Sequence, residues 1–207
     1  MSLPKPYYQD SAVTLYHGDC REIVPLLGRF DLLLTDPPYG IGFAAQPTNY
    51  QRAAGMKAMD WDDDAPDISR FLAACKDHCI WGGNYFSLPI SRGWLAWCKP
   101  DAPPSMGNLE LAWTGKDQNA KHFFWSIAAT NSERVGHPTQ KPLALITWCL
   151  SFFPEAQTVL DPFSGSGTTG RACKDLGRKC VMIEREEKYC EIAARRMGQE
   201  VLPLDAA

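Results

Sequence analysis

The residues with the clearest chemical potential follow a short apolar run in the sequence LLLTDPPYGIG. Residues 32–34 predict a buried strand, and Asp36, Pro37, Pro38 and Tyr39 come soon after it. Because proline lacks the N–H that a sheet ladder needs, and because a residue before proline is extended, we expect the strand to end at Asp36. The turn would then present a carboxylate, a proline carbonyl and an aromatic ring at the carboxyl end of a strand, where open α/β sheets bind ligands. A tight turn with an aspartate cap is the alternative explanation for Asp-Pro-Pro alone.

A second candidate site is rich in glycine. The sequence TVLDPFSGSGTTG, residues 158–170, predicts a strand, a turn and a helix that opens with small residues. Gly165, Gly167 and Gly170 fit the pattern G-x-G-x-x-G, and Glu184 closes the next strand at about the distance expected for a ribose-binding acid. By itself this pattern is typical of nicotinamide and flavin enzymes.

Two details of the glycine loop argue against a ligand with phosphates. Asp161 lies between the strand and the first glycine, where its negative charge would repel a pyrophosphate and attract a cation. The lysine and hydroxyl residue of a Walker loop are also missing. The loop therefore favours a cofactor with a ribose and a positive charge but no phosphate, and S-adenosylmethionine has these properties.

Strands and helices alternate around both candidate sites. Apolar runs predict strands at residues 13–16, 30–35, 79–82, 94–98, 109–113, 158–161 and 180–184. Helical periodicity predicts helices at residues 20–27, 66–78, 141–153, 167–176 and 186–197. Such alternation is the signature of an α/β sheet with parallel strands. No repeat or linker divides the chain, so we expect residues 1–207 to form a single domain.

Residues 43–65 interrupt this alternation. The stretch is polar, has no clear period and directly follows the Asp36 turn. We therefore expect a lid-like loop that closes over a substrate, and a plain surface excursion is the alternative.

Composition indicates a globular protein. Hydrophobic residues make up 45% of the 207 residues and charged residues 22%, and the net charge of −3 argues against a uniformly basic coat. No apolar run approaches the roughly 18 residues of a membrane span, and the first residues lack a secretory segment, so we expect a cytoplasmic protein. The eight cysteines are scattered, which predicts reduced thiols. The tightest cluster, Cys75, His78 and Cys79, falls on a predicted helix without a second pair, so no metal site is expected.

Three motifs now reveal a resemblance. TDPPYG, HPTQKP (residues 137–142) and DPFSGSGTT occur in that order, with LYHGDC before the first and MIERE after the last. Together they resemble the amino-methylating DNA methyltransferases of the permuted β class, in which the catalytic motif precedes the cofactor loop, and a small phage-like or solitary member in particular. The resemblance spans about residues 13–197. It implies a Rossmann-like, S-adenosylmethionine-dependent methyltransferase fold, with a mostly parallel sheet and helices on both faces.

The resemblance implies that Asp36, Pro37, Pro38 and Tyr39 are the catalytic residues. The exocyclic amine of a base is a poor nucleophile because its lone pair is delocalised into the ring. The Asp36 carboxylate and the Pro37 carbonyl could each accept an amino hydrogen, which favours a pyramidal nitrogen whose lone pair points at the sulfonium methyl. Tyr39 would stack on a base taken out of the duplex.

The resemblance also assigns a cofactor pocket. It implies that Glu184, at the end of the strand after the glycine loop, binds the ribose and that Asp19 of HGDC lies near the adenine. It also implies that HPTQKP contacts the methionine end of the cofactor. The implied residues are Asp19, Thr139, Lys141, Asp161, Phe163, Gly165, Ser166, Gly167, Thr168 and Glu184. Asp19 taken alone is explained equally well as the N-cap of the helix predicted at residues 20–27.

The expected reaction is methylation of the N6 amine of adenine in double-stranded DNA. An acid at position 36 is typical of adenine enzymes of this class, whereas cytosine N4 enzymes more often carry serine there. Cytosine N4 or RNA methylation, and a binding module without catalysis, are the alternatives. Only about residues 99–136 are available for target recognition, which favours a short target, loose specificity or a homodimer that shares the duplex.

Overall fold

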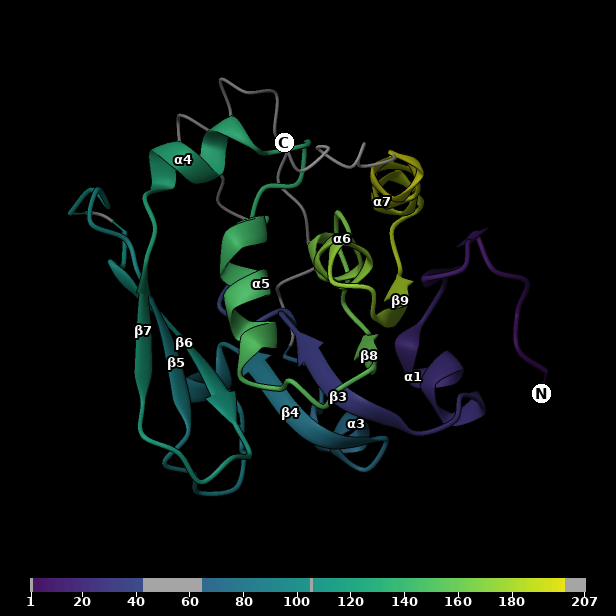
Figure 1. The fold of residues 1–207 in the computed structure, drawn as a ribbon, viewed down its shortest axis with the longest axis horizontal. Coiled ribbons are helices and arrows are strands. Elements are labelled where there is room, and N and C mark those ends of the chain that lie inside the picture. Colours follow the sequence, from purple (N-terminus) through teal and green to yellow (C-terminus); the bar gives the residue numbers. More distant parts are fainter. Residues whose placement is uncertain (1, 43–64, 105, 200–207) are drawn as a thin grey trace, which may run out of the picture.

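The computed structural model describes residues 2–42, 65–104 and 106–199, and its strands form one mixed sheet (Figure 1). The sheet order is β1-β2-β9-β8-β3-β4-β6-β5-β7. The strands are β1 (Tyr8–Gln9), β2 (Val13–His17), β3 (Phe30–Thr35), β4 (Cys75–Trp81), β5 (Trp94–Cys98), β6 (Leu109–Thr114), β7 (Lys121–Phe124), β8 (Thr158–Asp161) and β9 (Lys179–Glu184). The predicted lid at residues 43–65 lies outside the described residues except for Ala65.

The middle of the sheet brings the two candidate sites together. Strands β2, β9, β8, β3 and β4 run parallel to one another. In the β3–β8 pair, Leu32 lies beside Val159 and Leu33 beside Leu160. Both strands therefore end at the same edge of the sheet, with Asp36 just beyond β3 and Asp161 as the last residue of β8.

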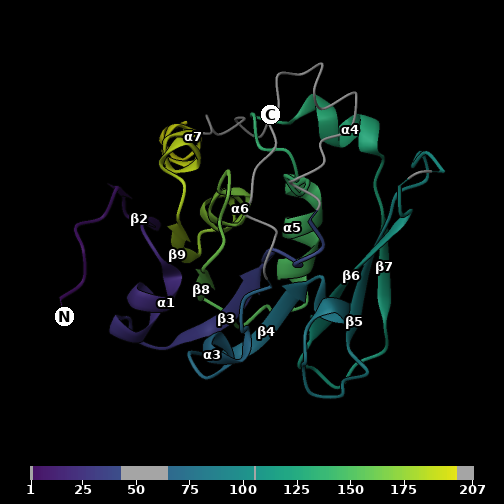
Figure 2. The ribbon, with the colours of Figure 1, turned by 180° about the vertical axis from the view of Figure 1, so that it is seen from behind.

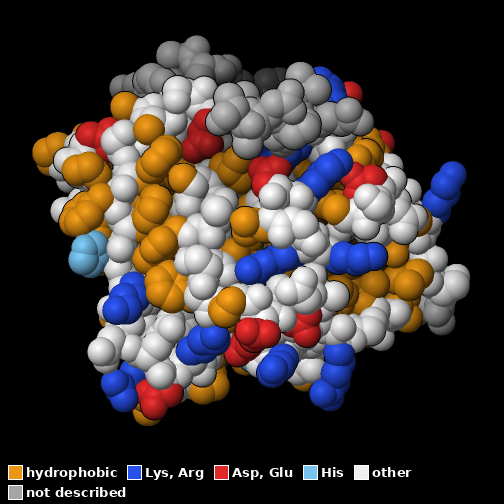
Figure 3. All heavy atoms as spheres, viewed as in Figure 1, with side chains coloured by type: hydrophobic (Ala, Val, Ile, Leu, Met, Phe, Trp, Pro, Cys, Tyr) orange, Lys and Arg blue, Asp and Glu red, His pale blue; other side chains and the backbone are white. Residues whose placement is uncertain are grey.

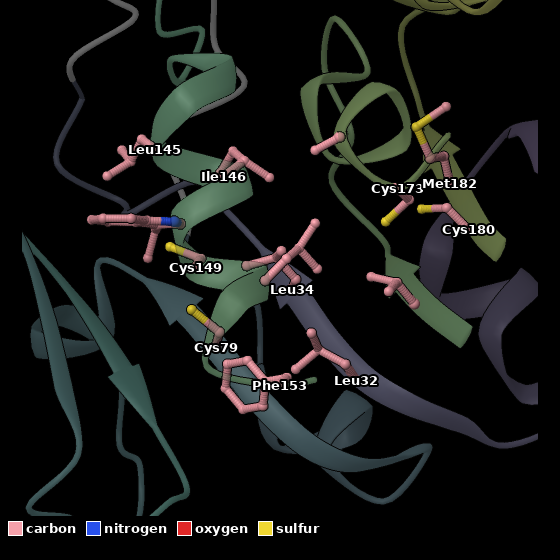
Figure 4. Close-up of a cluster of buried hydrophobic side chains, with 14 of the residues drawn as sticks. Leu32, Leu34, Cys79, Leu145, Ile146, Cys149, Phe153, Cys173, Cys180 and Met182 are labelled. Carbon is pink, nitrogen blue, oxygen red and sulfur yellow. The ribbon is translucent and has the colours of Figure 1, made fainter. Parts of the chain in front are cut away.

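Helices cover both faces of the sheet, as Figures 1 and 2 show. Apart from the short 3-10 turns η1 (Val24–Leu26) and η3 (Gly83–Tyr85), the helices of the described ranges are α1 (Cys20–Ile23), α3 (Ser69–Leu72), α4 (Ile127–Ser132), α5 (Leu143–Ser151), α6 (Thr168–Asp175) and α7 (Glu187–Gly198). Because side chains alternate along a strand, β3 contributes to two cores. Leu32 and Leu34 pack with residues of α5, α6 and α7, whereas Leu33 packs with residues of α1 and α3 (the first core is drawn in Figure 4). The predicted α/β fold, with its mostly parallel sheet and helices on both faces, is confirmed.

The helix predicted at residues 66–78 is wrong. Helix α3 covers only Ser69–Leu72, and strand β4 already begins at Cys75. This segment is extended because residues 75–80 pair with the parallel strand β3, and residues 79–81 pair in addition with the antiparallel strand β6. Sheet pairing thus overrides the weak helical pattern of its polar residues. Cys75, His78 and Cys79 consequently lie along a strand, not on a helix.

The segment at residues 99–136 forms the antiparallel side of the sheet and α4. Strand β6 runs antiparallel to both β4 and β5, and β7 lies at the edge beside β5. The Phe123 ring packs against Trp125, with ring centroids 6.0 Å apart, and against Trp148 of α5, with ring centroids 5.2 Å apart. Figure 3 shows hydrophobic side chains on the left of this face, over β7 and α5. Most aromatic residues here are therefore structural, but Phe124 is 65% exposed.

Several classes of feature are absent from the described ranges. All eight cysteines are free thiols, and most are buried. In the parts of the chain that the structure describes, no three His, Cys, Asp or Glu side chains come together as a metal site. No helix among those residues is long and apolar enough to cross a bilayer.

Candidate active site

One cavity of about 470 Å³ lies at the carboxyl ends of β3, β8 and β9. It is lined by Asp36 and Pro38 after β3, by most of the glycine loop and by residues of HPTQKP. Of the predicted site residues, those that line the cavity are Asp19, Asp36, Pro38, Thr139, Lys141, Asp161, Phe163, Gly165, Ser166, Thr168 and Glu184. Pro37, Tyr39 and Gly167 do not line the cavity. The sheet thus brings together two motifs that are more than a hundred residues apart in sequence.

Asp36 lies in a dense hydrogen-bonding environment at the end of β3. The Tyr39 hydroxyl donates to Asp36 Oδ1 at 2.7 Å, and the Lys141 ammonium donates to Oδ2 at 2.5 Å. Burial raises the pKa of Asp36, and the adjacent Lys141 ammonium opposes this shift. Each carboxylate oxygen can accept a second hydrogen, so Asp36 retains acceptor capacity toward a ligand.

Tyr39 is fixed by aromatic neighbours. Its ring stacks on Tyr85 with centroids 4.9 Å apart and an interplanar angle of 13°, and its edge meets Phe86. Gly82, at φ 67°, allows this arrangement, because a Cβ there would lie 2.1 Å from Tyr39 Cε1. The 3-10 turn η3 therefore holds the aromatic ring of the motif in place.

The glycine loop is fastened to Glu184 at the end of β9. The backbone N–H of Gly165 donates to Glu184 Oε2 at 2.8 Å, and that of Glu186 donates to Oε1 at 2.8 Å. Gly167 starts α6 at φ 77°, and a Cβ there would lie 3.0 Å from Ala193 of α7. Glycine at this position therefore permits both the left-handed turn and the close approach of α6 to α7.

Asp161 is a buried carboxylate surrounded by neutral donors. Thr35 Oγ1 donates to Asp161 Oδ1 at 2.8 Å, and the N–H of Phe163 donates to the same oxygen at 3.2 Å. Burial raises the pKa of Asp161 to about 6, although these hydrogen bonds oppose the shift. A cation in the cavity would stabilise the ionised carboxylate.

Asp19 is placed for both of the roles that the sequence allows. It caps α1 by accepting from the N–H of Arg21 at 2.8 Å, and its carboxylate also pairs with the Arg21 guanidinium. The hydrogen bond from Arg21 lowers the pKa of Asp19. The same residue lines the cavity, so the capping role and a ligand-binding role are compatible.

The HPTQKP motif connects the two halves of the cavity. Lys141 lies nearest to Asp36, and it also pairs with Glu110 of β6 at 3.2 Å. His137 lies against the glycine loop, because a Cβ on Gly165 would be 2.9 Å from His137 Nε2. Burial lowers the pKa of His137 to about 3, so its ring is neutral and can accept a hydrogen bond.

Several residues of the site escaped the sequence analysis. Thr35 holds Asp161, Glu110 pairs with Lys141, and Trp81 at the end of β4 lines the cavity. Thr35 begins TDPPYG but drew no attention beside Asp36, and Glu110 and Trp81 occupy ordinary strand positions outside any motif. His137 lies within HPTQKP, so its place in that motif was the available signal.

The cavity contains buried polar atoms that suit a ligand. Ser164 Oγ and Trp81 Nε1 are buried, lie in residues that line the cavity and have no hydrogen-bond partner among the described residues. Unpaired buried groups are unfavourable unless a ligand or water completes them. Acids at Asp161 and Glu184 add acceptors for hydroxyl groups and a favourable potential for a cation. These features fit S-adenosylmethionine, which combines ribose hydroxyls with a sulfonium.

Comparison with known proteins agrees with this chemistry. A family model described as DNA methylase, the N6/N4 methyltransferase model, matches residues 101–195. The Type II methyltransferase M2.LlaDCHI of Lactococcus lactis subsp. cremoris is 25% identical, over 95% of this chain and 93% of its own length. The Type II methyltransferase M2.MboI of Moraxella bovis is 26% identical, over 97% of this chain and 93% of its own length. These similarities support a DNA methyltransferase.

Solved structures share the fold. The crystal structure of an M1.HpyAVI–SAM complex matches with a TM-score of 0.61 and 24% identity, over 90% of this chain and 100% of that one. The cytosine-N4-specific PvuII DNA methyltransferase matches with a TM-score of 0.64 and 17% identity, over 96% of this chain and 90% of that one. This chain therefore shares its Rossmann-like α/β architecture with these solved structures.

Proposed function

We propose that this chain is an S-adenosylmethionine-dependent DNA methyltransferase that methylates the exocyclic N6 amine of an adenine taken out of double-stranded DNA. The observation that carries the proposal is the single cavity in which the Asp36 motif and the glycine loop meet. Either motif alone has another explanation. A carboxylate that faces the base, beside a loop that binds a cationic cofactor, provides for both the methyl acceptor and the methyl donor. The relatives are Type II enzymes, which relates the reaction to DNA methylation in restriction-modification.

The glycine-loop side of the cavity binds the cofactor in this proposal. Glu184 accepts from ribose hydroxyls, and its position is fixed by the N–H groups of Gly165 and Glu186. Asp161 faces the positive charge, with Asp19 on the adenine side and Thr139 and the loop residues around the remainder. S-adenosylmethionine supplies, when bound, an electrophilic methyl group on a sulfonium.

The β3 side of the cavity positions the base. Asp36 accepts one amino hydrogen with its remaining lone pairs, and the carbonyl of buried Pro37 accepts the other, so that the nitrogen becomes pyramidal. Tyr39, held by Tyr85, supports the base by aromatic contact, which is worth about 1–3 kcal/mol. Asp36 does not need to be a strong base, because the amine proton is lost easily once the nitrogen carries the methyl group.

The remaining features of the proposal concern the whole chain. One catalytic domain carries both sites, and residues 99–136 hold the target-recognition surface. Because that surface is small, a homodimer that shares the duplex is the proposed assembly. The motif order is that of the permuted β class, as in small phage-like or solitary enzymes. Because the proposed substrate is DNA, the proposed location of the protein is the cytoplasm.

The base can be identified by mass spectrometry of nucleosides. Unmethylated genomic DNA is incubated with the protein and S-adenosylmethionine, digested and analysed, with a parallel reaction on RNA. We expect N6-methyladenine from the DNA. N4-methylcytosine instead would keep the mechanism and overturn the choice of base, and no methylated nucleoside from DNA would overturn the proposed function.

A further inference from the structure

Four charged side chains form an alternating chain beside the cavity. Lys99, the residue after β5, donates to Glu110 Oε1 at 2.6 Å. Glu110 Oε2 lies 3.2 Å from the Lys141 ammonium, which in turn donates to Asp36 Oδ2 at 2.5 Å. The chain therefore joins four separate segments in the order Lys99, Glu110, Lys141, Asp36, with charges that alternate in sign.

Burial makes this arrangement energetically demanding. The side chains of Lys99 and Lys141 are only 6% and 7% exposed. A buried ammonium is tolerated when its charge is compensated and its hydrogens are bonded, and loss of one partner typically costs several kcal/mol. Asp36 alone would neutralise Lys141, so Glu110 is not needed to balance that charge, and Lys99 is needed only because Glu110 is there.

The positions of the four residues suggest why the second pair exists. Asp36 and Lys141 line the cavity, whereas Glu110 and Lys99 do not. Lys141 therefore has one acceptor on the side of the reacting base and one on the side away from it. A flexible lysine held from both sides has a fixed ammonium position, and the hydrogen bond that it donates fixes the Asp36 carboxylate in turn.

We propose that Glu110 and Lys99 are positioning residues for methyl transfer: Glu110 holds the Lys141 ammonium against the Asp36 carboxylate, and Lys99 holds Glu110. Neither residue touches the reacting groups, and both act through Lys141. The role rests on the proposed function of Asp36. It makes the hairpin of β5 and β6 part of the catalytic apparatus.

Electrostatics within the cluster gives the role a measurable signature. Burial raises the pKa of Asp36, Lys141 opposes this and the charge of Glu110 adds to it. Burial lowers the pKa of Lys141, but Asp36 and Glu110 outweigh this effect and hold that pKa above its usual value. The other titratable groups that interact with members of the cluster are Tyr39, His137, Cys149 and Asp161. These groups are unchanged in the variants below.

Removing a negative charge and removing a positive charge should shift the pH dependence of kcat in opposite directions. Transfer requires ionised Asp36 and protonated Lys141, so activity falls at low pH when Asp36 is protonated and at high pH when Lys141 is deprotonated. Glu110→Gln removes a negative charge, which lowers both pKa values and moves both limbs of the kcat profile to lower pH. Lys99→Met removes a positive charge and moves both limbs to higher pH. We also expect kcat of Glu110→Gln to fall about tenfold at the wild-type optimum.

The double variant and an exposed control separate this role from general damage. Lys99→Met combined with Glu110→Gln removes both charges, and we expect its limbs to return close to those of the wild type. Glu191→Gln on α7 removes an acid from an exposed i,i+4 pair with Arg195 and should leave the profile unchanged. Limbs that stay at their wild-type positions in both single variants, or that move in the same direction, would overturn the proposal.

A titration without turnover gives an independent readout. Carbon-13 NMR of the Asp36 carboxyl, assigned with Asp36→Asn, reports its pKa in the cofactor-free protein. We expect Glu110→Gln to lower this pKa and Lys99→Met to raise it, and an unchanged value in both variants would contradict the role. A wild type that methylates no DNA would overturn the proposed function, whereas this titration still decides whether Glu110 and Lys99 control the charge of Asp36.

Discussion

In the proposed reaction, two carboxylates with different surroundings have different roles. Asp36 is paired with the Lys141 ammonium and the Tyr39 hydroxyl, whereas Asp161 accepts from Thr35 and a backbone N–H. A carboxylate that is already paired with a cation is suited to orienting a neutral amine. One that is buried among neutral donors is suited to meeting a cationic ligand. The same residue type therefore serves two purposes through its environment.

Binding of S-adenosylmethionine should depend on the protonation of Asp161. Burial raises the pKa of this residue to about 6, so its carboxyl is protonated below that pH and loses its attraction for a sulfonium. We expect the affinity, measured by isothermal titration calorimetry, to weaken as pH falls through about 6. Asp161→Asn keeps the shape but not the charge, so it should bind weakly and without this pH dependence. Equal, pH-independent affinity in both proteins would refute the assignment of Asp161.

For individual residues, the sequence predicts those that belong to motifs and misses those that hold the motif residues in position. Asp36 follows β3 and Asp161 ends β8, each directly before a proline that marks a turn, and Glu184 is the last residue of the strand after the glycine loop. Glu110 occupies a polar position in an alternating strand, where a solvent-facing side chain is the ordinary expectation. Its function depends on Lys141, which approaches from another element, and no local pattern records that contact.

Among the elements, the junction of β4 and η3 controls the catalytic motif. Gly82 follows β4 in the left-handed region and lies against the Tyr39 ring, which η3 contacts through Tyr85. The apolar residues 79–82 predict the end of this strand but not its beginning, because Cys75, Lys76, Asp77 and His78 lack an apolar pattern. Their strand is stabilised by neighbours on both sides, which only the assembled sheet provides.

Gly82→Ala and Gly177→Ala form a matched pair that isolates this contact. Both glycines have φ near 67–68°, but a Cβ meets Tyr39 at position 82 and nothing within 4 Å at position 177. We expect Gly177→Ala to cost about 1–2 kcal/mol of unfolding free energy through backbone strain alone. Gly82→Ala should cost more, because the Tyr39 ring must also move, and only this variant should lose methyl transfer. Urea unfolding and initial rates measure the two effects, and equal losses in both variants would show that the contact is unimportant.

For the molecule as a whole, the fold followed from the alternation of strands and helices, but the reversed side of the sheet did not. Strands β5 and β6 read like the others in sequence and β7 was not predicted, yet β6 runs antiparallel to two neighbours and β7 occupies the edge. Direction depends on how short connections return to the sheet, and single-strand composition does not encode it. The adjacency of β3 and β8, in contrast, is what makes one site from two distant motifs.

Cofactor binding should stabilise the entire domain. A ligand present at about one hundred times its Kd stabilises the native state by about 2.7 kcal/mol, which raises the Tm of a domain of this size by roughly 5–10 °C. We expect this shift in differential scanning calorimetry with S-adenosylmethionine and none with NAD. A shift with NAD and none with S-adenosylmethionine would point to a nicotinamide enzyme instead.

The central claim is that the glycine-loop side binds the cofactor and the Asp36 side performs the transfer. Single-turnover methyl transfer by cofactor-saturated Asp36→Asn, with its cofactor Kd measured on the same preparation, tests this division most directly. We predict wild-type affinity for S-adenosylmethionine and a transfer rate about a hundredfold to a thousandfold lower, because one acceptor for the amine is lost. Transfer at the wild-type rate by this variant, or a loss of activity explained entirely by weaker cofactor binding, would contradict the account.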